Sequence, residues 1–203
     1  LIVIGAGQAG PFLAAKLAHA GKKVALIEAR QLGGTCVNRG CTPTKTLRKS
    51  ARVAYMARRA AEFGVDVGPV TVNFGVAMAR MRKRITDART GLEGWLGALP
   101  GLTIHYAHGQ LAGRDGADFI VQAGEHTLRA PQVVLNTGTR SFMPPIPGLS
   151  TVPALDSEGL LALDELPKKL VIIGGGYISL EMAQIFRRLG AEVSVIENNP
   201  RLT

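Results

Sequence analysis

Short apolar runs that end in glycines form the clearest pattern along this chain. Leu1–Ile4 leads into Gly5-Ala6-Gly7, and Leu170–Ile173 leads into Gly174-Gly175-Gly176. Each run has the length and the continuous apolar character of a buried strand. A stretch of helical period follows each glycine turn, and a second apolar run follows that. The pattern therefore predicts two strand–helix–strand (βαβ) units in one chain.

The two units are copies of one another. The similarity continues past the glycines at a constant offset, pairing Ala14 with Ala183, Gly21 with Gly190, Val24 with Val193 and Glu28 with Glu197. Each copy has a strand, a glycine turn, a helix, a second strand and a final acid, which is the order of a nucleotide-binding unit. Chance is a poor explanation for a match of this length.

The segment between the copies has other periods. Amphipathic spacing predicts two helices, and apolar stretches between Gly-rich turns predict four strands. The helices cover residues 44–64 and 74–99, the strands cover 102–107, 118–122, 126–129 and 131–136, and a Pro-rich linker covers 143–148.

Together these elements predict an α/β fold of two Rossmann-like lobes, with a helical excursion and a small antiparallel β-meander between them. We expect residues 1–149 to form the first lobe and residues 150–203 to begin the second. A doubly wound sheet needs more strands than residues 150–203 supply, and Leu1 already belongs to a strand. We therefore expect both termini to be truncated.

The composition is that of a folded protein, with 46% hydrophobic and 19% charged residues. No apolar run approaches the ~18–20 residues of a membrane span, and no secretory signal is visible. Two cysteines are too few for a secreted disulfide scaffold. These features favour a cytoplasmic protein without a membrane partner.

The net charge of +9 is concentrated between Cys36 and Arg89, where twelve Lys or Arg face three acidic residues. Nucleic-acid binding would call for a known motif or interleaved aromatic residues, and this stretch has only Tyr55, Phe63 and Phe74. A solvated basic face, or one that attracts anionic cofactors, is the favoured interpretation.

The first glycine turn has the spacing Gly5-x-Gly7-x-x-Gly10. In such a turn the first glycine permits the tight bend, the second lets a pyrophosphate approach, and the third lets helix and strand pack closely. Glu28 follows Gly5 by 23 residues and is placed to accept hydrogen bonds from a ribose. The alternative is that the glycines only shape the turn.

The second turn reads Gly174-x-Gly176-x-x-Ser179, and Glu197 stands at the same distance as Glu28 does in the first copy. Serine is compact enough for the third position. Glu197 should repel a 2′-phosphate, so the second lobe should favour NADH over NADPH.

Cys36 and Cys41 are the only cysteines. A disulfide closing so short a loop would stabilise the fold by only about 2 kcal/mol, which argues against a purely structural bridge. The segment must bend to join them, and a strained bridge is more easily reduced. A helix beginning near Cys41, with Lys45 one turn later, would lower the thiolate pKa. Metal binding by the two thiols, an inert disulfide and two buried free thiols remain as alternatives; we predict no metal site.

Four motifs together carry a family resemblance. They are the first glycine turn with Glu28, the Gly-Gly-Thr-Cys-x4-Cys-x-Pro-Thr-Lys of residues 33–45, Thr137-Gly138 ahead of an Ile-Pro-Gly, and the Gly-Gly-Gly-Tyr-Ile-x-Leu-Glu of residues 174–181. In this order and over the whole chain, they resemble the flavin-dependent pyridine nucleotide–disulfide oxidoreductases. The dithiol segment is most similar to that of mercuric reductases and related members.

The resemblance implies FAD contacts in the first lobe, at Gly5, Gly7, Gly10, Glu28, Gly34, Thr35, Lys45, Thr137 and Gly138. It implies NAD(P)H contacts in the second lobe, at Gly174, Gly176, Tyr177, Ile178, Glu181 and Glu197. It also implies a homodimer and a C-terminal interface domain beyond residue 203.

The resemblance assigns chemical roles as well. Electrons would pass from the nicotinamide to FAD and then to a Cys36–Cys41 disulfide, with Cys41 facing the flavin and Cys36 attacking the substrate. Lys45 would pair with Glu181 near the flavin, and Tyr177 would cover the nicotinamide pocket. A surface lysine, a helix-face glutamate and a packing tyrosine are the corresponding structural alternatives.

The chain departs from the family pattern in two places, with Thr44 where Ser is usual and Asn136 where Ala is usual before Thr137. None of His19, His105, His108 and His126 lies in the family's catalytic His–Glu motif, so residues 1–203 alone are expected to be inactive. The predicted enzyme is an NAD(P)H-dependent flavoprotein reductase acting on a disulfide, a metal ion or a quinone-like acceptor. Mercuric reductase, dihydrolipoamide dehydrogenase and a non-catalytic flavin-binding protein are the alternatives.

Overall fold

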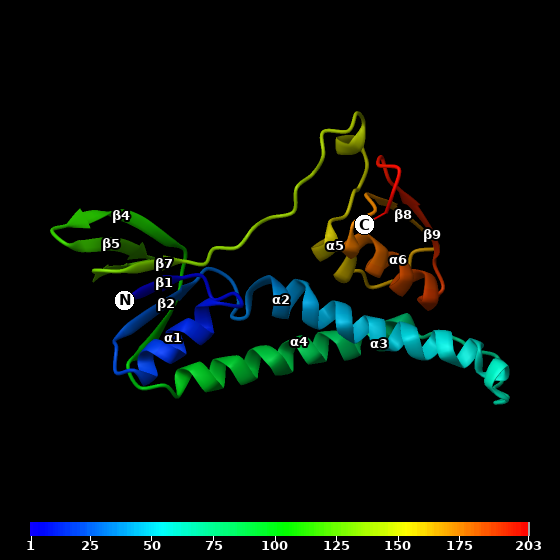
Figure 1. The fold of residues 1–203 in the computed structure, drawn as a ribbon, viewed down its shortest axis with the longest axis horizontal. Coiled ribbons are helices and arrows are strands. Elements are labelled where there is room, and N and C mark those ends of the chain that lie inside the picture. The colour runs from blue at the N-terminus through cyan, green and yellow to red at the C-terminus, as the bar shows by residue number, and fades with distance from the viewer. Residues whose placement is uncertain (203) are drawn as a thin grey trace. The chain divides into compact units, whose positions relative to one another are not determined.

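The computed structural model describes residues 1–202 of the chain. Its largest sheet has four parallel strands in the order β3, β2, β1, β7. These strands are Ile2–Ile4 (β1), Val24–Glu28 (β2), Leu102–Tyr106 (β3) and Val133–Leu135 (β7). Helix α1 (Gly10–His19) connects β1 to its parallel neighbour β2 and lies beside both strands in Figure 1, which confirms the first βαβ unit.

The parallel sheet is buried on both faces. One face packs against helices, in a cluster of Val3, Ala6, Ala14, Ala15, Val24, Leu26, Leu32 and Leu96. The other packs against a second sheet, in a cluster of Ile2, Ile4, Ile27, Val121, Ala123 and Ala130. Burial on both faces explains why the strands β1 and β2 appear in the sequence as nearly continuous apolar runs.

The second sheet is the predicted antiparallel meander, but its membership differs from the prediction. It consists of β4 (Gly109–Asp115), β5 (Asp118–Ala123) and β6 (His126–Ala130). Residues 102–107, which the sequence predicts as a strand, contain β3, and β3 pairs parallel with β2 in the first sheet. The sequence pattern missed β4 because that strand is mostly exposed, has few β-branched residues and shifts register between Leu111 and Gly113.

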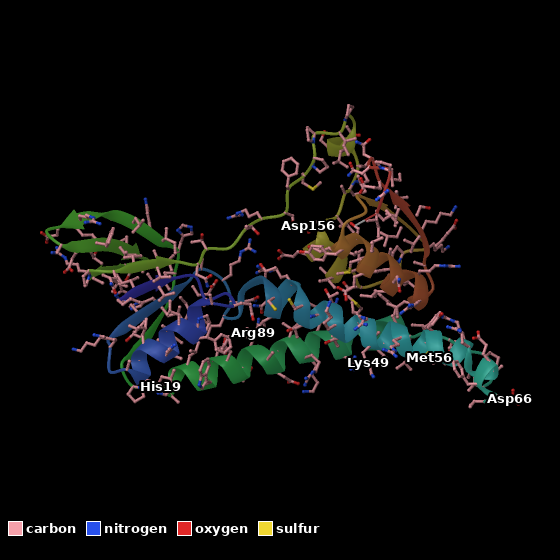
Figure 2. All side chains as sticks on the ribbon, in the orientation of Figure 1. His19, Lys49, Met56, Asp66, Arg89 and Asp156 are labelled. Carbon is pink, nitrogen blue, oxygen red and sulfur yellow. The ribbon has the colours of Figure 1, made fainter. Side chains whose placement is uncertain are left out.

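The helical excursion is confirmed. It contains α2 (Gly34–Arg39), α3 (Cys41–Arg58), the short 3₁₀ turn η1 (Ala60–Phe63) and α4 (Phe74–Gly97). Helix α3 buries Pro43, Thr44, Leu47, Ala51 and Ala54 on one side. Lys49 and Met56 are among its exposed residues and are labelled in Figure 2.

The second βαβ unit is also confirmed. It consists of β8 (Lys169–Ile173), α6 (Tyr177–Leu189) and β9 (Glu192–Ile196), with β8 and β9 parallel. Two short elements precede it, η2 (Leu149–Thr151) and α5 (Ser157–Leu161), the latter capped by Asp156 (Figure 2).

The strands of this unit bury less than the sequence predicts. Val171 is 60% exposed and Ile173 is 50% exposed, while Leu170 and Ile172 on the other face of β8 are half-buried. That face packs under α6, which inserts Met182, Ile185, Phe186 and Leu189 into the interior.

By compactness the chain divides into two units. The first comprises residues 1–41 and 85–144, and the second comprises residues 42–84 and everything from residue 145. The helical segment 42–84 thus groups with the second βαβ unit. The assignment of 1–149 to an FAD domain and of 150–203 to the start of an NAD(P) domain stays a prediction. Across residues 1–202, no helix has both the length and the apolarity required to cross a membrane.

Candidate functional site

The first glycine turn leaves no room for side chains at two of its glycines. Gly5 has a φ of +103° and donates its N–H to the Ile27 carbonyl at 2.7 Å. A β-carbon at Gly5 would lie 2.1 Å from the Asn136 carbonyl oxygen, and one at Gly10 would lie 2.1 Å from the Gly5 carbonyl oxygen. Both positions therefore require glycine, because real β-carbons do not approach backbone oxygens so closely.

Glu28 braces this turn from the end of β2. Its Oε2 accepts a hydrogen bond from the Ala6 N–H and its Oε1 accepts one from the Arg30 N–H, both at 2.8 Å. Each carboxylate oxygen can accept a further bond, so the geometry leaves room for a ribose hydroxyl. The bracing of the turn itself was not predicted from the sequence.

The second glycine turn repeats the arrangement. Gly174 has a φ of +95° and donates to the Ile196 carbonyl at 2.8 Å. Glu197 accepts the Gly175 N–H at 2.5 Å and the Asn199 N–H at 2.7 Å. The hydrogen bonds from Asn199 and Gly175 lower the pKa of Glu197, because they stabilise its charged form. Each of the two backbone hydrogen bonds to Glu28 in the first copy thus has a counterpart at Glu197 in the second.

Beyond its second glycine turn, the start of α6 presents exposed side chains. Gly176 is the N-cap of α6, and Tyr177 and Ile178 follow with 79% and 46% exposure. Both are accessible to a ligand, and neither is part of the core.

The dithiol segment, residues 33–45, packs closely against the first glycine turn through Gly34. Gly33 and Gly34 have positive φ values of +92° and +57°, which turns the chain into α2. A β-carbon at Gly34 would lie 2.6 Å from the Gly7 Cα. The backbone before Cys36 therefore contacts the turn that the sequence assigns to a pyrophosphate.

The two cysteines lie on consecutive helices. Cys36 is in α2, Gly40 ends that helix, and Cys41 begins α3, so the predicted bend and the predicted helix start are both confirmed. Both residues are free thiols here, not the disulfide expected from the sequence. The pKa of Cys36 is raised to about 11, first by burial and then by its hydrogen bond with the Cys41 side chain.

Asn38 holds the dithiol segment in shape, and sequence reasoning missed it. Its Nδ2 donates to the Leu32 carbonyl at 2.9 Å and to the Gly34 carbonyl at 3.0 Å. Its Oδ1 is buried without a hydrogen-bond partner among the described residues. Only its position between the two cysteines could have pointed to it.

Lys45 and Glu181 meet in the second compact unit. The Lys45 Nζ lies 2.6 and 2.7 Å from the two Glu181 carboxylate oxygens. The Lys45 side chain is 58% exposed, so the pair adds little to stability. It borders a cavity of about 490 Å³, whose wall includes Arg48 and Tyr177. The ion pair expected from the family resemblance is present, whereas its chemical role stays a prediction.

Thr137 and Gly138 follow β7 at the carboxyl edge of the parallel sheet. Gly138 has a φ of +70° and is exposed, as is Thr137. Thr35, at the start of α2, is exposed as well. The residues predicted to contact FAD in the first unit are therefore clustered on the glycine turn, the dithiol segment and the end of β7, and their roles are still predictions.

Comparison with protein families matches residues 1–203 to the pyridine nucleotide-disulphide oxidoreductases. The chain is 39% identical over 204 residues to a dihydrolipoyl dehydrogenase from Chlamydia trachomatis, covering 99% of the chain and 43% of that protein. It is 34% identical over 201 residues to a mercuric reductase from Shigella flexneri, covering 97% of the chain and 35% of that protein. The chain thus spans less than half the length of these curated relatives.

Solved structures show the same family relationship. The HOCl-induced flavoprotein disulfide reductase RclA from Escherichia coli superposes with a TM-score of 0.83 at 34% identity, over 99% of this chain and 42% of that one. A Cu(II) complex of the same reductase superposes with a TM-score of 0.84 at 33% identity, over the same shares of the two chains. The sequence matches the family model over residues 1–203 and the fold matches over 99% of the chain, so the chain belongs to the pyridine nucleotide-disulphide oxidoreductase family.

Proposed function

We propose that the complete protein is a flavoprotein reductase that uses NADH, FAD and the Cys36–Cys41 pair to reduce an acceptor. Family membership implies FAD and a pyridine nucleotide as cofactors. The observation that carries the proposal is the close packing of Gly34 against Gly7, which supports a dithiol segment beside the turn that we propose to bind the FAD pyrophosphate. FAD, when bound, supplies the two-electron relay between the nicotinamide and the disulfide.

The backbone of the first glycine turn has the features that an FAD pyrophosphate would need. A β-carbon at Gly7 would meet only the Asn136 amide, at 3.5 Å, and the Gly7 Cα is covered by Gly34. A turn of this kind ahead of a helix N-terminus offers backbone N–H groups to phosphate oxygens. Glu28 retains acceptor capacity for a ribose, and Thr35, Thr137 and Gly138 are exposed around the turn.

The proposed cycle divides the work between the cysteines. Two electrons and two protons convert the Cys36–Cys41 disulfide into two thiols, which regenerate it by reducing the acceptor by two electrons. Cys36 attacks the acceptor, and because its pKa is raised, its proton must first pass to a base. In the second unit Lys45 pairs with Glu181, and its positive charge would support negative charge on a reduced flavin. Tyr177 would cover the nicotinamide.

The acceptor is a disulfide, a metal ion or a quinone-like molecule. Relatives include a mercuric reductase and dihydrolipoyl dehydrogenases, so both metal-ion and disulfide chemistry occur in the family. A non-catalytic flavin-binding protein is the remaining alternative. We further propose that the protein acts as a homodimer in the cytoplasm.

The test is an anaerobic titration of the complete protein with NADH. We expect a long-wavelength thiolate-to-flavin absorption band in the wild type, because Cys41 is proposed to face the flavin. In Cys36→Ser, Cys41 cannot form the disulfide, so the band should be present with the oxidised flavin before NADH is added. In Cys41→Ser the band should be absent throughout, so the two variants are controls for each other. Persistence of the band in Cys41→Ser would overturn the role of Cys41. Unchanged acceptor turnover in Cys36→Ser would favour the non-catalytic alternative.

Coenzyme choice is a separate prediction. We expect kcat/KM for NADH to exceed that for NADPH by about 10- to 100-fold. The Glu197 carboxylate accepts hydrogen bonds from Gly175 and Asn199, which fix its position and lower its pKa. A fixed negative charge there would repel the 2′-phosphate of NADPH. Steady-state kinetics of the wild type and Glu197→Gln measure this. The variant should narrow the ratio, and comparable wild-type values for both coenzymes would show that Glu197 does not discriminate.

A further inference from the structure

We propose that Asn136 is a positioning residue that locks the first glycine turn in the shape needed by the FAD pyrophosphate. The proposal rests on the proposed function for its ligand, and on this chain's own geometry for the lock. Asn136 is the residue directly after β7, at the carboxyl edge of the parallel sheet.

The backbone of Asn136 is fixed by the sheet. Its N–H donates to the Ile4 carbonyl at 2.7 Å, one residue beyond the pairing of Ile4 with Leu135. Its carbonyl oxygen and carbon lie 2.1 and 2.6 Å from where a Gly5 β-carbon would be. The residue is therefore wedged against the start of the turn.

The side chain of Asn136 then reaches into the turn. Its Nδ2 donates to the Gly5 carbonyl at 3.2 Å. The orientation of the amide follows from chemistry, because a carbonyl oxygen can only accept, so the nitrogen must face it. The same Nδ2 would lie 2.9 Å from a β-carbon at Gly10 and 3.5 Å from one at Gly7. One amide thus bonds to Gly5 and lies beside the positions that β-carbons at Gly7 and Gly10 would take.

The second glycine turn provides an internal comparison. Apart from Gly174, Gly176 and their immediate chain neighbours, no atom of the described residues lies within 4 Å of where β-carbons at these two glycines would be. Both turns share the backbone bond to the second strand and the bracing glutamate.

A locked turn should bind its ligand more tightly. Glycine residues lose more backbone freedom on ordering than other residues, so a turn with three of them is costly to fix when the ligand binds. A side chain that holds the turn beforehand lowers that cost, which is the effect of preorganisation. Removing it should weaken FAD binding without affecting the other lobe.

The experiment uses the complete protein with its FAD removed, titrated with FAD while flavin fluorescence is followed. Asn136→Ala should raise the Kd for FAD about tenfold, and Asn136→Asp should raise it further, because a carboxylate cannot donate to Gly5 and repels phosphate. The matched control is Asn199→Ala, which removes a side-chain bond to Glu197 at the second turn. It should leave the Kd for FAD within about twofold of wild type.

Hydrogen exchange of residues 5–10 in the FAD-free protein gives a readout that needs no ligand. Asn136→Ala should speed exchange there and leave residues 174–179 unchanged. Should that variant not fold, Asn136→Ser, which is too short to reach Gly5, takes its place with the same expected shifts. A Kd for FAD within twofold of wild type and unchanged exchange at residues 5–10 would overturn the lock. Equal weakening of FAD and NADH binding would also overturn it, because it would indicate general destabilisation.

The outcomes also separate this inference from the proposed function. Wild-type protein that does not bind FAD would overturn the proposed function, while exchange at residues 5–10 would still decide whether Asn136 locks the turn. If the wild type binds FAD, and Asn136→Ala has the same Kd for FAD and unchanged exchange at residues 5–10, the lock is overturned and the proposed function is not.

Discussion

Gly10→Ala is expected to abolish FAD binding by the complete protein and to destabilise the first unit by about 3 kcal/mol or more. A β-carbon at this position would lie 2.1 Å from the Gly5 carbonyl oxygen and 2.9 Å from the Asn136 Nδ2. The Gly5 carbonyl is backbone and cannot yield easily, because the Gly5 N–H is hydrogen-bonded to the Ile27 carbonyl. The measurements are FAD content after purification and denaturant unfolding of the FAD-free protein.

Gly91→Ala is the matched control for this substitution. Gly91 lies inside α4 with no atom near its missing β-carbon, so alanine should be neutral or should stabilise the helix by up to ~1 kcal/mol. The two variants make the same chemical change, and only the surroundings differ. Normal FAD content in Gly10→Ala would show that the turn can open, contrary to the packing described above.

The sequence predicts local elements well where their burial is strong. The two βαβ units could be predicted because β1 is buried on both faces and because the second copy repeats the first. The helices α3 and α4 could be predicted from their amphipathic spacing. Strand β4 could not, because an exposed strand containing Gly, Gln, Arg and Asp lacks the alternation that marks a half-buried strand.

Pairing and fine contacts are harder to predict than elements. Nothing local in Leu102–Tyr106 indicates whether it joins the meander or pairs with Val24–Glu28, since that choice depends on packing between distant segments. The same limit applies within the site. The sequence predicted the glycines and Glu28, but the bonds of Asn38 and Asn136 to backbone carbonyls depend on how loops close in three dimensions.

Alkylation of Cys36 in the reduced protein is expected to keep accelerating up to a pH of about 11. The thiolate is the reactive form, so the rate should rise about tenfold per pH unit below the pKa of Cys36, which is raised to about 11. In the unfolded chain the rise should level off near the ordinary value of 9.0. Near neutral pH, Cys36 should be alkylated about tenfold more slowly in the folded protein than in the unfolded chain. Its smaller thiolate fraction in the folded protein outweighs the higher nucleophilicity of its more basic thiolate. Mass spectrometry after timed iodoacetamide treatment measures each cysteine separately.

Cys41→Ala tests the cause of that shift. Burial is the largest contribution to the raised pKa of Cys36, ahead of the hydrogen bond and the charge of Cys41, so the variant should lower the pH at which the rate levels off only part of the way towards 9.0.

The raised pKa of Cys36 also makes the free energy of unfolding depend on pH. Because the folded pKa lies above the unfolded one, folding favours the protonated thiol, so the stabilisation is complete below about 9.0 and disappears as the pH rises through about 11. A rate that levels off near 9.0 in the wild type would contradict the burial of Cys36, and with it the need for a base to accept its proton before it attacks an acceptor.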